Sequence, residues 1–160
     1  MKGRRLFLSL ALAALVALSL AGAASAAKLD VADHGGRPLT TALTGAAEVP
    51  PGDLDGSGTA TITVNPGQEE ICWEISVQDI TLPATAAHIH VGAAGTAPPD
   101  NVVVPLSAPV AGLDPTSGFA SGCTTVEREK ALAILKNPEN YYVNVHNEPF
   151  PTGALRGQLS

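Results

Sequence analysis

Three histidines are the residues of this chain best suited to do chemistry. His88 and His90 are separated by one residue in a segment, 86–91, whose pattern predicts a β-strand, so both side chains lie on one face of it. His146 ends another predicted strand, 141–146, on the face away from its valines. If the two strands pair, the three imidazoles converge. Neutral imidazoles are good ligands for Zn²⁺ and Cu²⁺, so we expect a possible site for one copper or zinc ion.

Other interpretations of the histidines stay open. A His-x-His pair can belong to a solvated strand face, and histidine rings can fasten a loop by bonding backbone carbonyls. The pattern is also similar to the metal strand of copper/zinc superoxide dismutase, and Arg156, between glycines near the end of the chain, adds to that likeness. The resemblance implies a redox-active metal site, although the other metal ligands of that enzyme have no counterpart here.

A polar group of residues is expected beside the histidines. This predicted polar rim consists of Asn144, Glu148, Arg156 and Gln158. The alternative is an ion pair between Glu148 and Arg156 that fixes the final strand. No Gly-x-Ser-x-Gly motif, phosphate-binding loop or Ser-His-acid set is found, so the sequence predicts no catalytic residues and a non-enzymatic protein.

The start of the chain has the features of a secretory signal peptide. Basic residues precede an apolar run (6–20), and residues 24–26 read Ala-Ser-Ala, a small-x-small cleavage pattern. The apolar run is too short to be a convincing membrane span. We predict a signal over 1–26, a flexible leader over 27–38 that contains His34, and a secreted or periplasmic protein without a membrane span in its mature form.

Cysteine content and charge agree with export. The chain has two cysteines, Cys72 and Cys123, and an oxidising compartment favours one disulfide between them, with two free thiols as the alternative. The formal net charge is −6 over 160 residues, and removal of the basic signal makes the chain more acidic. An acidic chain of this kind argues against nucleic acid as a partner.

Short alternating segments separated by Gly- and Pro-rich turns fill the rest of the chain. The strands are expected over 39–43, 58–64, 71–77, 86–91, 102–106, 119–123, 141–146 and 154–159. One helix is expected over 126–137, begun by Thr124 with Glu127 in a capping box and ended by Pro138. This pattern predicts an all-β fold, an antiparallel immunoglobulin-like or Greek-key sandwich or barrel with one short helix.

The order of several motifs resembles the CHRD domain, which was first described in the developmental protein chordin. The motifs are LTGAAEVPP (43–51), GSGTATITV (56–64), AAHIHVGAAG (86–95) and YYVNVHNEPFPTGALRGQL (141–159). The resemblance covers 39–160 as one domain and implies an immunoglobulin-like or Greek-key β architecture in an exported microbial protein. It implies no established reaction. We therefore expect a monomeric binding or adhesion module whose partner is an extracellular protein or matrix ligand.

Overall fold

The computed structural model describes residues 35–98 and 101–160. The predicted signal and the predicted leader up to His34 lie outside these ranges. Nine antiparallel strands make up nearly half of the described chain. They are β1 (Arg37–Thr44), β2 (Ser57–Asn65), β3 (Glu70–Gln78), β4 (Ala86–Val91), β5 (Val102–Leu106), β6 (Val110–Ala111), β7 (Ser117–Thr125), β8 (Tyr141–His146) and β9 (Leu155–Gln158). The predicted all-β antiparallel fold is confirmed.

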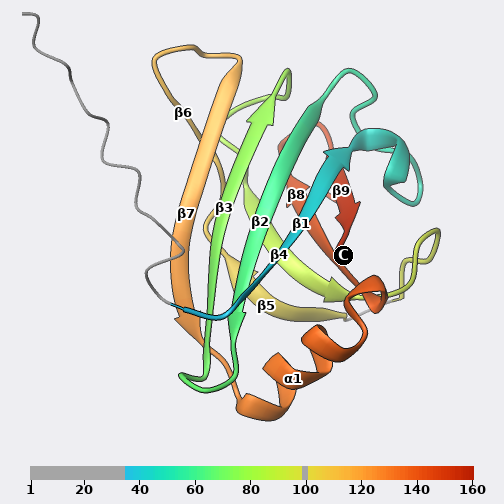
Figure 1. The fold of residues 1–160 in the computed structure, drawn as a ribbon. Coiled ribbons are helices and arrows are strands. Elements are labelled where there is room, and N and C mark those ends of the chain that lie inside the picture. The colour runs from blue at the N-terminus through green and yellow to red at the C-terminus, as the bar shows by residue number, and fades with distance from the viewer. Residues whose placement is uncertain (1–34, 99–100) are drawn as a thin grey trace, which may run out of the picture.

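The strands form one continuous sheet in the order β5-β4-β8-β9-β1-β2-β3-β7-β6. The sheet curls so that β1, β2, β3 and β7 lie in front of β4, β5, β8 and β9, which gives a two-layered body (Figure 1). The two layers are joined where β1 meets β9, at the pair Thr44 and Arg156. The register of β4 against β8 therefore lies entirely within the back layer.

The two edge strands of the sheet, β5 and β6, follow each other in the sequence, so the residues between them cross from one layer to the other. Trp73 Nε1 donates to Ser107 Oγ at 3.0 Å, and Ser107 Oγ donates to the Ser121 carbonyl at 3.2 Å. The amide of Ala84 donates to the Pro109 carbonyl. These bonds tie the connection to both layers and nearly close the curled sheet.

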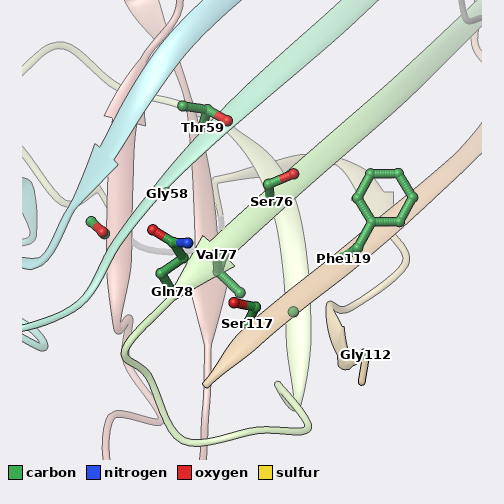
Figure 2. A pocket seen from close by; sticks show the side chains of 10 residues that line it. Gly58, Thr59, Ser76, Val77, Gln78, Gly112, Ser117 and Phe119 are labelled. Atoms are coloured by element: carbon green, nitrogen blue, oxygen red, sulfur yellow. The ribbon is translucent and has the colours of Figure 1, made fainter. Parts of the chain in front are cut away.

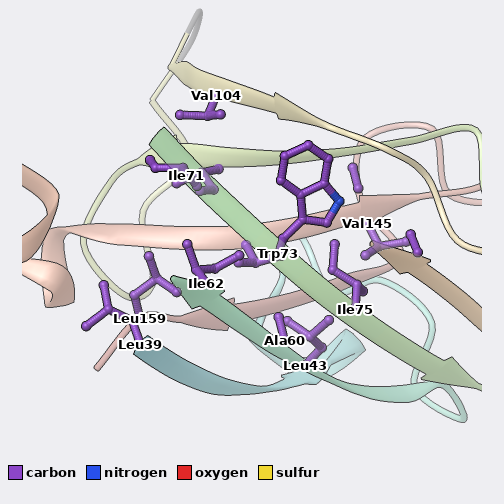
Figure 3. Packing of buried hydrophobic residues seen from close by; sticks show 14 of the residues in the cluster. Leu39, Leu43, Ala60, Ile62, Ile71, Trp73, Ile75, Val104, Val145 and Leu159 are labelled. Carbon is purple, nitrogen blue, oxygen red and sulfur yellow. The ribbon is translucent and has the colours of Figure 1, made fainter. Parts of the chain in front are cut away.

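Alternation along the strands explains the core. In β2 and β3 every second residue is apolar and buried, including Ile62, Ile71, Trp73 and Ile75 (Figure 3). The back layer contributes Ile89, Val143, Val145 and Leu155, each with no exposed surface. Because successive side chains on a strand point to opposite faces, burial of these residues leaves their neighbours on the outer faces of both layers.

A disulfide and a short helix complete the fold. Cys72 and Cys123, directly opposite each other on β3 and β7, form the predicted disulfide. Within residues 35–98 and 101–160 the one α-helix, α1 (Arg128–Lys136), lies at one end of the body, where it buries Ala131 and Ile134 (Figure 1). In the described part of the chain no helix is long and apolar enough to cross a bilayer.

The predicted start of the helix is wrong. Thr124 belongs to β7, where it is paired with Ile71, and Glu127 is the residue at the N-cap, without a side-chain capping bond. The ladder between β3 and β7 keeps Thr124 extended, so its hydroxyl cannot cap a helix that begins at Arg128. The two-residue strand β6 was also not expected from the sequence.

The junction between the layers leads to a first prediction. Gly157 on β9 has no space for a side chain, because a Cβ there would collide with the Ala42 carbonyl oxygen and the Thr41 hydroxyl of β1. We expect Gly157→Ala to lower the free energy of unfolding by about 1–3 kcal/mol in urea denaturation, as overpacking does elsewhere. Gly112→Ala is the matched control, since a Cβ there contacts nothing within 4 Å. Equal stability of the two variants would contradict this account of the junction.

Candidate metal centre

Seven polar or aromatic side chains form one outer face of the back layer. The inward residues of β4, β8 and β9 are the apolar ones buried in the core, so the alternate residues point outward. In the register, His88 lies opposite Asn144, His90 opposite Tyr142, and Asn144 opposite Arg156. The outward set is His88, His90, Tyr142, Asn144, His146, Arg156 and Gln158.

The three histidines converge on this face. His88 Nδ1 lies 3.2 Å from His146 Nε2, and the centroids of the His88 and His90 rings are 5.3 Å apart. One nitrogen of each histidine can be chosen so that all three lie within 4.8 Å of one another. Two nitrogens that bond one zinc or copper ion at roughly 2 Å are at most about 4 Å apart, so the rings would have to rotate to share one ion. The arrangement could hold one metal ion and leave a further coordination position open.

Hydrogen bonds to Asn101 determine which nitrogen of His90 is free. The Asn101 amide nitrogen donates to the Val91 carbonyl at 2.9 Å and to the Tyr142 hydroxyl at 2.8 Å. Its Oδ1 therefore faces His90 Nδ1, 2.8 Å away, and this ring nitrogen must be the N–H donor. The lone pair is left on Nε2, which is buried without a hydrogen-bond partner in the described structure.

His146 is oriented in the same way by a backbone carbonyl. Its Nδ1 lies 3.0 Å from the Pro151 oxygen, which can only accept, so Nδ1 carries the proton and Nε2 the lone pair. That lone pair accepts a hydrogen bond from His88 Nδ1. A metal could replace this hydrogen bond once the His88 proton has moved to Nε2. Such bonds on the far nitrogens are typical of histidine ligands in metal sites.

The electrostatics of the face keep the imidazoles neutral. Burial lowers the pKa of His88 to about 4, and the neighbouring His146 and His90 add to this effect. Burial also lowers the pKa of His90, against the opposing hydrogen bond that His90 donates to Asn101, and that of His146, against the hydrogen bond that it donates to Pro151. Neutral rings at pH 7 have the lone pairs that a metal ion needs.

The His90 ring stacks on the Tyr142 ring. The His90 and Tyr142 rings are nearly parallel, with an angle of 7° between their planes and 4.9 Å between centroids. The guanidinium carbon of Arg156 lies 3.4 Å from the Tyr142 centroid, a cation–π contact. Arg156 is only 2% exposed and donates to the carbonyls of Thr96 and Ala93. The guanidinium thus fixes the loop after β4 and holds Tyr142 in place.

The predicted polar rim needs a correction. Glu148 is exposed, and the described contacts of Arg156 include no ion pair with it. The carboxylate near Arg156 is instead that of Glu48, which accepts a short hydrogen bond from the Asn144 amide. Glu148 sits in the turn beyond the end of β8, whereas the loop after β1 brings Glu48 over the sheet. Gln158 donates to the carbonyls of Gly92 and Glu139.

Two residues of the site were missed from the sequence, Glu48 and Asn101. The available signal in the sequence was an acid within the otherwise small and apolar stretch before Pro50, and the structure leaves Glu48 only 7% exposed. Gly153 makes room for it, because a Cβ there would collide with the Glu48 carboxylate. Asn101 follows a Gly- and Pro-rich loop and gives no comparable signal.

A second group of potential ligands, Glu70, Cys72 and Cys123, also lies together. The two sulfurs are joined in the disulfide, so neither is a thiolate that could bind a metal ion. The histidine group is therefore the one whose donor atoms are available.

Glu48 gives a prediction about pH and stability. Burial raises the pKa of Glu48 to about 7, against the opposing effects of Arg156 and the Asn144 hydrogen bond. The native state then keeps a proton that the unfolded state has lost above pH 4.5, so this group's contribution to the free energy of unfolding falls as pH rises from about 4.5 to about 7. The free energy of unfolding of the wild type minus that of Glu48→Gln, measured by urea denaturation at pH values across this range, should therefore decrease as pH rises. A flat difference would contradict the buried, protonated carboxyl.

We compared the chain with models of known protein families, with curated proteins and with solved structures. The CHRD domain model matches residues 39–159, most of the chain and almost all of the described fold. Searches of curated proteins and of solved structures found no match. The matched range includes every residue of the outer face described above, together with the loop that supplies Glu48. The chain belongs to the CHRD domain family.

Proposed function

We propose that this CHRD-domain protein is exported and binds one divalent transition-metal ion, copper or zinc, through His88, His90 and His146. The observation that carries the proposal is the buried lone pair of His90 Nε2, which has no protein partner and belongs to a group of three neutral imidazoles. Buried polar atoms are seldom left unsatisfied, and a bound ion would satisfy this one. The disulfide is compatible with an oxidising location outside the cytoplasm.

The donor set favours copper(II) over zinc. The described residues include no free cysteine, and the single methionine of the full sequence is Met1, so the described fold supplies no sulfur ligands of the kind that select copper(I). Nitrogen ligands bind copper(II) more tightly than zinc by the general order of divalent metals. With three protein ligands, the remaining position is open to water or a small ligand. Copper there could change oxidation state, which zinc cannot, so a redox role depends on copper occupying the site.

Binding or adhesion remains the other proposal for this protein. The partner would be an extracellular protein or matrix ligand, and no catalytic residue is required. A metal ion in the three-histidine site is compatible with this role as a structural or recognition element. Retention on washed cell envelope or matrix, measured with the metal-loaded and the metal-free chain, distinguishes a metal-dependent from a metal-independent form of this binding.

Metal content provides the direct test of the proposed site. We expect one copper(II) per chain in calorimetric titration and elemental analysis, with an electron paramagnetic resonance spectrum typical of nitrogen ligands. His88→Ala, His90→Ala and His146→Ala should each weaken binding at least about tenfold, because each removes one of three ligands. His34→Ala is the matched control within the same chain. Substoichiometric metal that none of the three substitutions changes would rule out the site.

Asn101 provides a more specific test, because it contacts His90 on the side away from the expected ion. We expect Asn101→Ala to lower copper affinity about 10- to 100-fold, the usual effect of losing a bond that orients a ligand. Asn140→Ala is the control, because Asn140 is exposed and its backbone carbonyl lies beside Gly92, in the loop between β4 and Asn101. Unchanged affinity in Asn101→Ala, with three-histidine binding intact, would show that the His90 tautomer is set by something else.

A further inference from the structure

The front layer has an outer face of quite different chemistry. By register and burial, hydroxyl groups recur at outward positions on all four of its strands, β1, β2, β3 and β7. We call this the hydroxyl face, and its hydroxyl residues are Thr40, Thr44, Ser57, Thr59, Thr61, Ser76, Ser117 and Ser121. It lies on the layer opposite β4 and β8, so it is separated from the histidines by the core (Figure 1).

The central polar groups of the hydroxyl face are free to bind a ligand. Thr59, Ser76 and Gln78 are exposed, and within the described chain their side chains make no hydrogen bond to protein. Each hydroxyl can both donate and accept, and the amide of Gln78 offers two donors and an acceptor. Ser117, at one border, already donates to Asp114. A ligand rich in hydroxyl groups could satisfy this mixed set.

Two hollows on the face adjoin each other. One of about 460 Å³ is lined in part by Thr59, Ser76, Gln78, Ser117 and Phe119 (Figure 2). The other, of about 520 Å³, is lined by β1 and β2 and shares Thr59 with the first. Because they share a lining residue, the hollows together extend across neighbouring strands. This shape suits a chain of several small units better than a single compact molecule.

An exposed aromatic ring borders the first hollow. Phe119 is 48% exposed on β7, and Val110 of β6, directly opposite it, is 57% exposed. In Figure 2 the Phe119 ring stands clear of the strand beside Ser76 and Ser117. An apolar ring kept in solvent next to free hydroxyls matches the two sides of a sugar, whose ring presents C–H groups on one face and hydroxyls at its edge.

Charge narrows the class of partner. Glu70 and Glu74 are acidic residues at outward positions of β3, and Asp114 lies at the border, in a chain that carries 15 acidic residues. A face whose charged groups are acidic offers no cation to a polyanion. Protein interfaces are depleted in serine and form around larger apolar cores than Phe119 and Val110 supply. A neutral polyhydroxylated polymer is the partner that remains.

We propose that the hydroxyl face binds a neutral polysaccharide. Phe119 packs against the C–H face of one sugar ring, and Thr59, Ser76 and Gln78 exchange hydrogen bonds with hydroxyls of that ring and the next. The second hollow, beside Thr40 and Thr61, receives the following unit. Binding needs no metal ion and no residue of the three-histidine site, so the proposal stands or falls independently of the metal centre.

Affinity electrophoresis of the whole chain tests the proposal. Native gels contain hydroxyethylcellulose, galactomannan, glucomannan or soluble starch as neutral probes, and alginate or heparin as anionic ones. We expect retardation by at least one neutral polysaccharide, about tenfold weaker in Phe119→Ala and at least about threefold weaker in Gln78→Ala. Leu132→Ala, which removes an exposed apolar side chain from α1, is the matched control and should migrate like wild type. His88→Ala should also retain binding.

Several outcomes would overturn the proposal. These are no retardation in any of the neutral gels, retardation in the anionic gels alone, and neutral-gel retardation that Phe119→Ala leaves unchanged. Sedimentation of the same proteins gives one further outcome: a dimer that depends on Phe119, without polysaccharide binding, would assign the face to a second copy of this chain. Because Phe119 is half exposed, the variant is expected to fold, and an unchanged circular dichroism spectrum verifies this.

Discussion

The register between β4 and β8 is the constraint on which the candidate metal centre depends. It places Ala86 opposite His146 and His88 opposite Asn144, so the three imidazoles share one face while Ile89 and Val143 pack into the core. A slip of one residue would exchange the two faces and bury the histidines among apolar side chains. The apolar core therefore fixes the position of the imidazoles, although it contributes no ligand.

Next to the imidazoles, loop residues form hydrogen bonds with a buried charged group, which offsets part of the free-energy cost of its burial. Arg156 is almost fully buried, yet two loop carbonyls, the Gln158 amide oxygen and the Tyr142 ring surround its charge. Glu48 and Asn144, which are 96 residues apart in the sequence, pair beside it. Such a network costs free energy wherever a buried member lacks a partner, as Asn144 Oδ1 does in the described structure. Gly153 leaves space for the Glu48 carboxylate. The same loops hold His90 and His146 by their far nitrogens.

Sequence patterns predicted which side chains of each strand point into the core, but they did not predict which strands lie next to each other in the sheet. Alternation alone put Trp73 in the core and the three histidines outside it, because the period of a strand depends on local geometry. The strand order depends on how the whole sheet curls, which local patterns do not encode. Glu48 and Asn101 reach the site through loops, whereas Glu148 is expected in the polar rim because it lies near His146 in the sequence. Thr124 looked like a helix cap, but its pairing with Ile71 outweighs that local preference.

A curled sheet gives the molecule two outer surfaces with one shared core, and their chemistry differs for a physical reason. The back layer is covered by loops that exclude water, which keeps imidazoles neutral and fixes their tautomers. The central strands of the front layer carry no such cover, so Thr59, Ser76 and Gln78 stay solvated and adaptable. A rigid, partly dry surface suits an ion that demands fixed geometry, whereas an open surface of free hydroxyls suits a long and flexible polyol. Ile62 and Ile75 in front and Ile89 and Val143 behind belong to one core, which separates the two surfaces.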